Sequence, residues 1–272
     1  QTTQEAVHSA VKMEADRQNA VGVAVGVLID GKIAFYSSTG YQDRESQIPV
    51  SRSTMFRWAS ISKSLTAITL LQLAENDVLS LDQTVNQFLV HYPSQQTSDG
   101  KSHDITLEQL LTHQAGIVHY TNGVVTGTPR NYVRPHPSRH VRLALNGFNQ
   151  SLLLNVPGTA YSYTTRGYIL LSAIVEQAAG RPFHVQVERM IAKPLAMNTL
   201  QPDYQWKRIQ NRAVGYRKST TGEIVVSSDT DVSWKLGGGG FISNIDDLAK
   251  FAEGLLQRKL VSQEMQTMMF TR

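Results

Sequence analysis

The sequence predicts an α+β fold, built from an antiparallel sheet and several helices. Two strand-like runs, residues 21–29 and 32–37, flank Asp30-Gly31, and Asp-Gly between two β-prone runs is a strong hairpin signal. A long run of helical periodicity then begins near Ser60, and further helix signals follow along most of the remaining chain. These observations favour one sheet near the N-terminus with helices packed around it.

Composition bounds the functions that the chain can have. Of its 272 residues, 41% are hydrophobic and 18% are charged, which suits one large domain or two smaller lobes. No apolar run approaches the roughly 18 residues of a membrane span. The net charge of +4 is too diffuse to indicate a nucleic-acid partner. The absence of cysteine excludes disulfides, a thiolate nucleophile and cysteine-ligated metal.

The first residue, Gln1, is not methionine. Removal of a signal peptide and a boundary chosen for expression both give such a start. We favour the first and expect an exported protein, periplasmic or extracellular.

The N-terminal half begins with a polar, modestly amphipathic helix over residues 4–18, before the hairpin. A connector over residues 40–49 leads to the helix near Ser60. That helix is predicted to have one buried stripe, because apolar residues recur at three-residue steps along it. The stripe consists of Leu65, Ile68, Leu71 and Ala74, with Leu73 close to it.

The second half carries several helix caps. Thr106 and Gln109 form a capping-box pattern for a short helix over 105–113, and Gly180 ends a strong helix over 168–179. The other predicted helices are a stretch over 140–154, a helix over 183–192 closed by Pro194 and a closing helix over 245–256. A hairpin is predicted over 216–226, with its turn at Thr221-Gly222. The remaining segments are a polar loop up to about 104, an irregular loop over 121–137 and a glycine run over 237–240.

Basic residues gather in one loop, which prolines interrupt. A solvated surface loop and a wall that attracts anionic substrates both fit this cluster. Its members are Arg130, Arg134, His136, Arg139, His140 and Arg142.

The chemistry is predicted to centre on Ser60-Ile61-Ser62-Lys63. Ser60 and Lys63 are three residues apart, so they share one face of the first helical turn. A serine hydroxyl becomes nucleophilic when a base takes its proton, and a lysine of lowered pKa one turn away can do so. Such spacing also occurs by chance at solvated helix starts, so companion motifs are needed to support a catalytic role.

A tyrosine-rich stretch over residues 157–171 supplies the second motif, and with it the chain resembles the serine β-lactamase and penicillin-recognising superfamily. The resemblance runs nearly end to end. It is strongest to the branch of class C β-lactamases, DD-peptidases and esterases, and two details are similar to the mitochondrial serine β-lactamase-like proteins. Those details are Ser60-Ile61-Ser62-Lys63-Ser64-Leu65 and Tyr163-Thr164-Thr165-Arg166-Gly167-Tyr168.

The resemblance implies a sheet flanked by helices together with a mainly helical lobe. Residues 1–58 and about 227–272 would form the α/β lobe of a single domain, and about 59–226 the helical lobe. It also implies Tyr163 as general base or proton relay with Lys63, although Tyr161-Ser162-Tyr163 is a competing frame for the motif. An ionised tyrosine needs a nearby cation at neutral pH, and Lys63 can supply it.

The remaining parts of the implied site depart from the family pattern. Thr165 stands where the branch usually has asparagine, and it is expected at the substrate together with Gly238 and Gly239 of the glycine run. The third motif of the branch, Lys/His-x-Gly on a strand, is matched in letters by Lys235-Leu236-Gly237. The residues that follow resemble the segment before that motif instead. We therefore expect the motif, the strands around it and one oxyanion donor to lie beyond the chain.

The function expected from these motifs is a serine hydrolase that forms an acyl-enzyme on an amide or ester; peptidase, esterase and β-lactamase activities stay open. The alternative is a weakly active or non-catalytic binder of the same fold. We expect a small-molecule or peptide substrate, no cofactor, and association through an exposed sheet edge. A metal site is not expected. The histidines show no helical His-x-x-x-His pattern with a carboxylate and are assigned surface or packing roles; they are His113, His119, His136 and His140.

Overall fold

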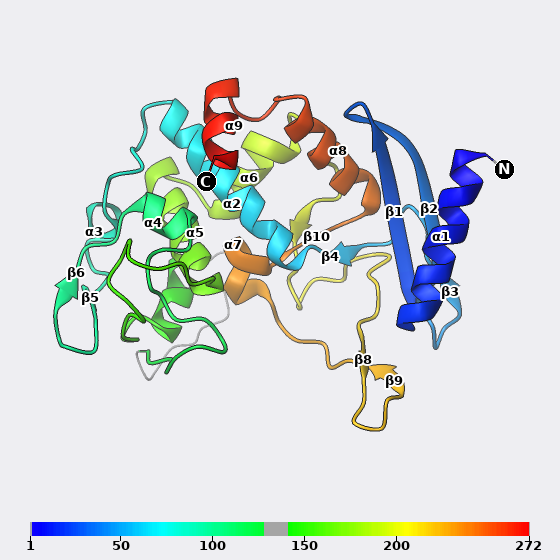
Figure 1. The fold of residues 1–272 in the computed structure, drawn as a ribbon, viewed down its shortest axis with the longest axis horizontal. Coiled ribbons are helices and arrows are strands. Elements are labelled where there is room, and N and C mark those ends of the chain that lie inside the picture. The colour runs from blue at the N-terminus through cyan, green and yellow to red at the C-terminus, as the bar shows by residue number, and fades with distance from the viewer. Residues whose placement is uncertain (1, 128–140, 272) are drawn as a thin grey trace.

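The computed structural model describes residues 2–127 and 141–271. Its elements form an α+β fold (Figure 1), as the sequence predicts. The β1–β2 hairpin and α1 stand at one end of the view, and most helices gather at the other. The division into two lobes at the predicted boundaries stays a prediction.

The hairpin forms the first sheet. β1 (Gly22–Ile29) pairs antiparallel with β2 (Lys32–Asp43), and β2 pairs with β3 (Ile48–Pro49). The turn residues Asp30 and Gly31 have φ angles of 51° and 72°, the left-handed conformation that a two-residue hairpin turn requires. The predicted hairpin is therefore confirmed.

β2 is longer than expected because Gly40 does not end it. Gly40 pairs with Gly22 at a φ of 77°, and a Cβ there would lie 2.2 Å from the Val21 carbonyl oxygen. Gly40 therefore allows a close backbone approach inside the strand, and the predicted connector does not begin there.

Two predicted helices lie against this sheet. α1 (Thr3–Gln18) packs on β2, and α8 (Ile245–Leu256) packs on β1. Both have capped N-termini, with Thr2 forming a capping box with Glu5 and the Asn244 side chain accepting the Asp247 N–H.

A second, smaller sheet connects distant parts of the chain. Its order is β4 (Phe56–Arg57), β10 (Phe241–Ser243) and β7 (Gln201–Pro202). It holds the residues just before Ser60 beside the end of the glycine run. The sequence did not signal this sheet, because strands of two or three residues carry no readable alternation.

The helical part is built around α2 (Ser62–Glu75) and α5 (Thr165–Ala179), which pack on one another. Its other helices are α3 (Val85–Phe88), α4 (Leu107–Leu111), α6 (Phe183–Val187), a π-helix at Glu188–Ala192, α7 (Leu236–Gly239) and α9 (Gln263–Phe270), with 3-10 turns at Ala59–Ile61, Val141–Gly147 and Ser233–Lys235. Two small hairpins complete the chain, β5 (Gln95–Gln96) with β6 (Ser102–His103), and β8 (Tyr216–Lys218) with β9 (Ile224–Val226), whose Tyr216 hydroxyl accepts the Arg44 N–H at 2.8 Å. α9 was not predicted.

α2 differs from the prediction in how it is buried. The periodicity predicted one buried stripe, whereas ten of its residues on all sides are buried, including the polar Thr66, Thr69 and Gln72. The helix lies in the centre, between α5, α6 and α7. The polar side chains are tolerated there because each bonds a backbone carbonyl, as Thr66 does with Gly237 at 2.7 Å.

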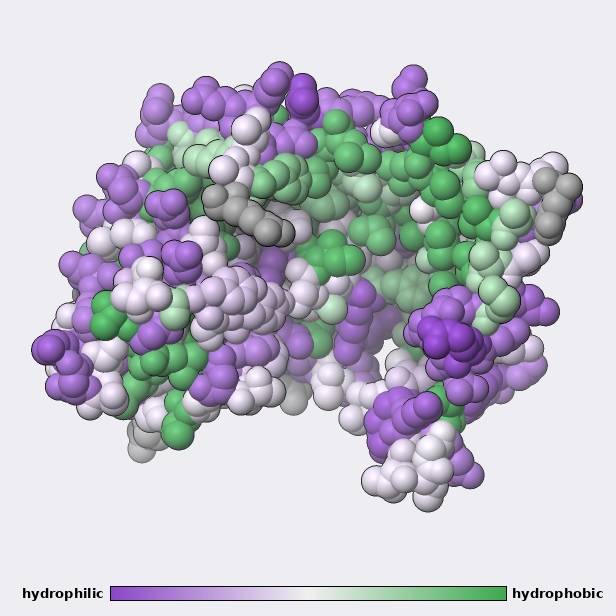
Figure 2. All heavy atoms as spheres, in the orientation of Figure 1, coloured by the Kyte–Doolittle hydropathy of each residue, from purple (hydrophilic) through white to green (hydrophobic). Residues whose placement is uncertain are grey.

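Beside β1 lies an apolar groove of about 270 Å³. Within the described residues, β1 pairs with β2 alone, so its other edge borders this groove. Figure 2 shows apolar surface in the hollow between the helices and the hairpin. The groove is lined by Gly22, Val23, Ala24, Phe56, Arg57, Trp58, Ile61, Ser243, Asn244, Ile245 and Leu248.

Candidate active site

Ser60 stands exposed at the junction between β4 and α2. The preceding residue, Ala59, has a φ of 45°, a left-handed conformation that is unusual for a residue with a Cβ. The 3-10 turn Ala59–Ile61 then leads into α2. This turn presents the Ser60 hydroxyl at the surface, while the helix behind it is buried.

Lys63 lies one turn further on and is buried, with 6% of its surface exposed. Its Nζ donates to Ser60 Oγ at 3.1 Å, to Thr165 Oγ1 at 3.1 Å and to the Gly238 carbonyl at 2.7 Å. Burial lowers the pKa of Lys63, and hydrogen bonding to Tyr163 opposes part of this effect.

Tyr163 approaches the serine from the segment before α5. Its hydroxyl lies 2.7 Å from Ser60 Oγ, and its ring centroid lies 4.8 Å from Lys63 Nζ. Burial alone would raise the pKa of Tyr163, but hydrogen bonds with Lys63 and Ser60 and the charge of Lys63 lower it overall. Tyr161, the tyrosine that begins the competing motif frame, is 68% exposed and makes an edge contact with His113.

Thr165 is the first residue of α5 and is only 3% exposed. Its hydroxyl accepts the bond from Lys63, so the structure places it behind the lysine. Gly238, in α7, accepts from Lys63 through its carbonyl. Gly239 is also buried, beside the Ala59 backbone and the Lys235 side chain. The substrate contacts expected of Thr165, Gly238 and Gly239 stay predictions.

The letters Lys235-Leu236-Gly237 fall on a 3-10 turn and on α7. The third motif of the branch stands on a strand, so this segment lacks the secondary structure that the motif requires. The expected position of the third motif elsewhere stays a prediction.

Two histidines contact the Tyr163 segment from behind. His113 Nδ1 accepts the Thr164 N–H at 3.1 Å, and His119 Nδ1 accepts the Thr165 N–H at 3.2 Å. Sequence reasoning assigned both to surface or packing roles. No sequence signal reveals these bonds, since they join segments 51 and 46 residues apart.

Among residues 2–127 and 141–271, no group of three acidic or histidine side chains is arranged to hold a metal. In the same ranges, none of the helices combines the length and the apolar character that crossing a membrane requires. His136, His140 and the basic cluster, apart from Arg142, lie outside the described residues.

Comparison with known proteins gives one family. The family model described as Beta-lactamase matches residues 7–272. The mouse protein "Serine beta-lactamase-like protein LACTB, mitochondrial" is 28% identical over 91% of this chain and 56% of its own length. "Putative penicillin-binding protein PbpX" of Bacillus subtilis is 29% identical over 90% of this chain and 57% of its own. The chain thus spans about half the length of these curated relatives.

A solved structure shares the fold. "EstCE1, a hydrolase with promiscuous acyltransferase activity" superposes with a TM-score of 0.81 at 24% identity, over 95% of this chain and 74% of that one. At this identity the likeness concerns the fold alone.

Proposed function

The chain belongs to the beta-lactamase family, and from that premise we propose that it is a serine hydrolase that forms an acyl-enzyme on an amide or ester. The observation that carries the proposal is that Ser60 Oγ is hydrogen-bonded to both Lys63 and Tyr163. A nucleophile, a base and a group that orients the base are what covalent hydrolysis requires.

In the proposed reaction, the phenolate of Tyr163, stabilised by Lys63, takes the proton of Ser60. Ser60 Oγ then bonds to the substrate carbonyl carbon, and the carbonyl electrons move to oxygen. When the tetrahedral intermediate collapses, the bond to the leaving amine or alcohol breaks, and that group takes the proton from Tyr163. In the second half of the reaction, Tyr163 takes a proton from water, and the water oxygen bonds to the acyl carbon. The bond to Ser60 Oγ then breaks, Ser60 takes the proton from Tyr163, and the acid is released.

The developing oxyanion is expected to meet the backbone N–H of Ser60. The family resemblance implies a second donor from a further strand. Removal of one such donor costs on the order of 10²–10³ in rate.

The test is covalent labelling by a fluorophosphonate probe, with hydrolysis of a neutral activated ester measured in parallel. Ser60→Ala should lose both signals while retaining its unfolding temperature. Ser64→Ala, a serine on the same helix, is the matched control and should keep them. Equal labelling of wild type and Ser60→Ala would contradict Ser60 as nucleophile.

The alternative function is a non-catalytic binder of the same fold. The presence of Thr165 where the branch usually has an amide favours it, since a buried hydroxyl reaches less far toward a substrate. Retention of a labelled penicillin without covalent attachment would support this alternative.

Association and location are also proposals. The edge of β1 beside the apolar groove is a template for pairing with another strand. Sedimentation at increasing concentration should therefore show self-association, and a purely monomeric chain would contradict it. Export from the cytoplasm stays a prediction that cell fractionation checks.

A further inference from the structure

His113 and His119 both bond the backbone at the start of α5. Thr164 is the N-cap of that helix and Thr165 its first residue. The N–H groups at a helix start have no carbonyl partner within the helix. Here the two imidazoles satisfy two successive N–H groups, directly after Tyr163 in the chain.

The same rings contact Tyr163 from two sides. The centroid of His113 lies 4.6 Å from that of Tyr163 at an interplanar angle of 40°, and the centroid of His119 lies 5.3 Å away at 88°. The phenol therefore has one imidazole tilted over it and another perpendicular to it. These contacts restrict the ring that places its hydroxyl on Ser60.

The main chain of the histidine segment fixes the other side of the same loop. The carbonyl of His113 accepts the Ser162 N–H at 2.8 Å, and the carbonyl of Val118 accepts the Thr164 hydroxyl at 3.1 Å. The residues on both sides of Tyr163 are thus bonded to one segment, and the Tyr163 ring contacts the histidines of the same segment.

Both histidines must be neutral to make these bonds. An Nδ1 that accepts a hydrogen bond carries no proton, so each ring carries its proton on Nε2. Burial lowers the pKa of His113 to about 4, helped by the charges of Lys63 and His119. Burial also lowers the pKa of His119, with the cations Lys63, Arg166 and Lys235 acting in the same direction.

The titratable groups that face the two rings from the described residues are cations and tyrosines. Lys63 acts on both rings, Tyr161 and Tyr168 contact His113, and Tyr120 contacts His119. Arg166 and Lys235 complete this set for His119. The cations oppose an imidazolium on either ring and so maintain the accepting state, whereas a phenolate at Tyr163, which contacts both rings, would act in the opposite direction.

We infer that His113 and His119 are positioning residues, which as neutral acceptors at Thr164 and Thr165 hold the Tyr163 phenol against Ser60. They bond the backbone after Tyr163 and contact its ring, so they act through the loop. The inference rests on the proposed function for its kinetic consequence, but the positioning itself is a property of the folded chain.

The kinetic test compares two substitutions of His113. His113→Asn retains an acceptor near the position of Nδ1, whereas His113→Phe retains an aromatic ring without an acceptor. The Phe variant should lose about threefold to tenfold in kcat with little change in KM, the size expected of one neutral hydrogen bond. The Asn variant should recover most of that loss. Equal losses in the two variants would overturn the inference.

A double-substitution cycle separates positioning from general stability. If His113 acts through Tyr163, then His113→Phe should cost nothing further once Tyr163→Phe is present. A loss that is the same in both backgrounds would show a structural role only. His184→Phe is the matched control, because His184 is another histidine with a pKa lowered by burial, but it contacts Tyr204. It should leave kcat unchanged in both backgrounds.

A spectroscopic measurement tests the positioning without enzymatic activity. Imidazole ¹⁵N spectra of the wild-type chain should show both rings protonated at Nε2 alone at neutral pH. On acidification, the ring signals of Tyr163 should shift as His113 and His119 protonate. An Nδ1 proton on either ring at neutral pH would overturn the inference, even in an inactive protein. Conversely, the expected tautomers in a chain that hydrolyses nothing would refute the proposed function alone.

Discussion

Ser60 Oγ is in contact with two side chains that can move its proton, and each changes the pKa of the other. The hydrogen bond from Lys63 lowers the pKa of Tyr163 against the opposing effect of burial, and burial lowers the pKa of Lys63. A base works best when its pKa lies near the operating pH. The shifts bring both groups closer to that condition than a free lysine or tyrosine.

The pH dependence of hydrolysis should follow this pair. The active form is deprotonated, so activity is present above the pKa of the pair and lost as the pH falls through it. Lys63→Met removes the bond and the charge that lower the pKa of Tyr163. The acid limb of kcat/KM against pH should then move to higher pH, measured with a neutral ester. A limb that moves to lower pH would contradict the coupling, and Lys32→Met, an exposed lysine, serves as control.

Tyr163→Phe tests the identity of the tyrosine. The change keeps the ring between the imidazoles and removes the hydroxyl that contacts Ser60. We expect kcat to fall by about 10²–10⁴, the usual contribution of a general base. Tyr161→Phe should change kcat by less than about twofold, because that side chain is 68% exposed and lies away from Ser60. A reversed order of the two effects would show that the other frame is the functional one.

At the scale of elements, α7 connects the site to the helices around it. A Cβ at Gly237 would lie 2.4 Å from the Ser172 Cβ, so the glycine allows α7 to lie directly on α5. This close approach brings the Gly238 carbonyl to Lys63. The glycine run in the sequence is therefore a packing surface for two helices.

Alanine substitutions at two neighbouring glycines separate this packing from helix propensity. A Cβ at Gly238 would lie 2.5 Å from Thr165 Cγ2, whereas one at Gly239 would meet nothing closer than 3.6 Å. Gly238→Ala should lower the free energy of unfolding by about 1–3 kcal/mol through overpacking and reduce hydrolysis. Gly239→Ala receives the same gain in propensity without the close contact, so its free energy of unfolding should stay the same or rise slightly. Chemical denaturation of both variants checks this, and equal effects would refute the packing argument.

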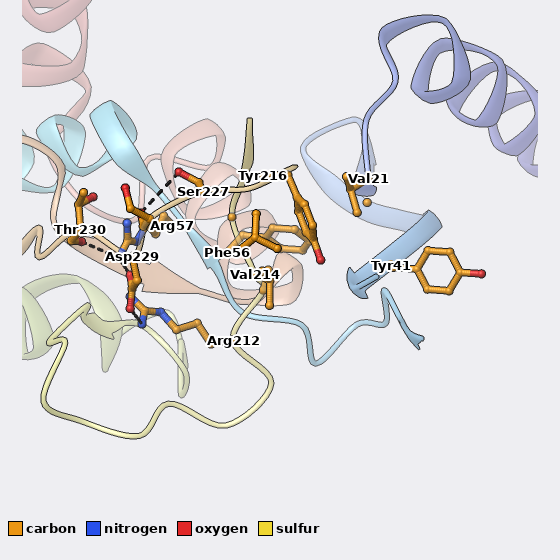
Figure 3. A pocket seen from close by; sticks show the side chains of 15 residues that line it. Val21, Tyr41, Phe56, Arg57, Arg212, Val214, Tyr216, Ser227, Asp229 and Thr230 are labelled. Atoms are coloured by element: carbon orange, nitrogen blue, oxygen red, sulfur yellow. Dashed lines mark hydrogen bonds and ion pairs between the residues drawn. The ribbon is translucent and has the colours of Figure 1, made fainter. Parts of the chain in front are cut away.

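At the scale of the whole molecule, one buried carboxylate joins segments that are far apart in sequence. Asp203, with a fully buried side chain, bonds Arg57 of β4 and also Arg212, whose Nη2 donates to it at 2.8 Å. Both arginines also bond the half-exposed Asp229. Figure 3 shows Arg57, Arg212 and Asp229 together at one side of a pocket of about 590 Å³, whose other side is formed by Val21 and Tyr41. Ser60, Lys63 and Tyr163 are not among the lining residues.

The two aspartates of this network should differ in their effect on stability. Asp203→Ala removes the buried carboxylate that both arginines bond, and because they are partly exposed and keep Asp229, it should cost about 1–3 kcal/mol. Asp229→Ala, with a side chain 54% exposed, should cost about 0–1 kcal/mol. Thermal unfolding of both variants provides the measurement. A small effect of Asp203→Ala would show that the network contributes little to holding these segments together.

The sequence by itself determined the features that depend on neighbouring residues. Asp30-Gly31 specifies the hairpin turn, Thr106 and Gln109 cap α4, and Gly180 ends α5 in the left-handed conformation. The spacing of Ser60 and Lys63 likewise fixes their shared face. These features follow from local hydrogen bonds and backbone sterics, which a short stretch of sequence contains in full.

Only the tertiary structure decided which distant groups meet. Tyr163 reaches Ser60 from 103 residues away, and two histidines without any sequence signal bond the segment that carries it. The burial of α2 on all sides, including Lys63, depends on α5, α6 and α7 packing around it. The lowered pKa of Lys63 follows from that burial. Local sequence cannot encode these properties, because desolvation and long-range contacts arise only when the whole chain has packed.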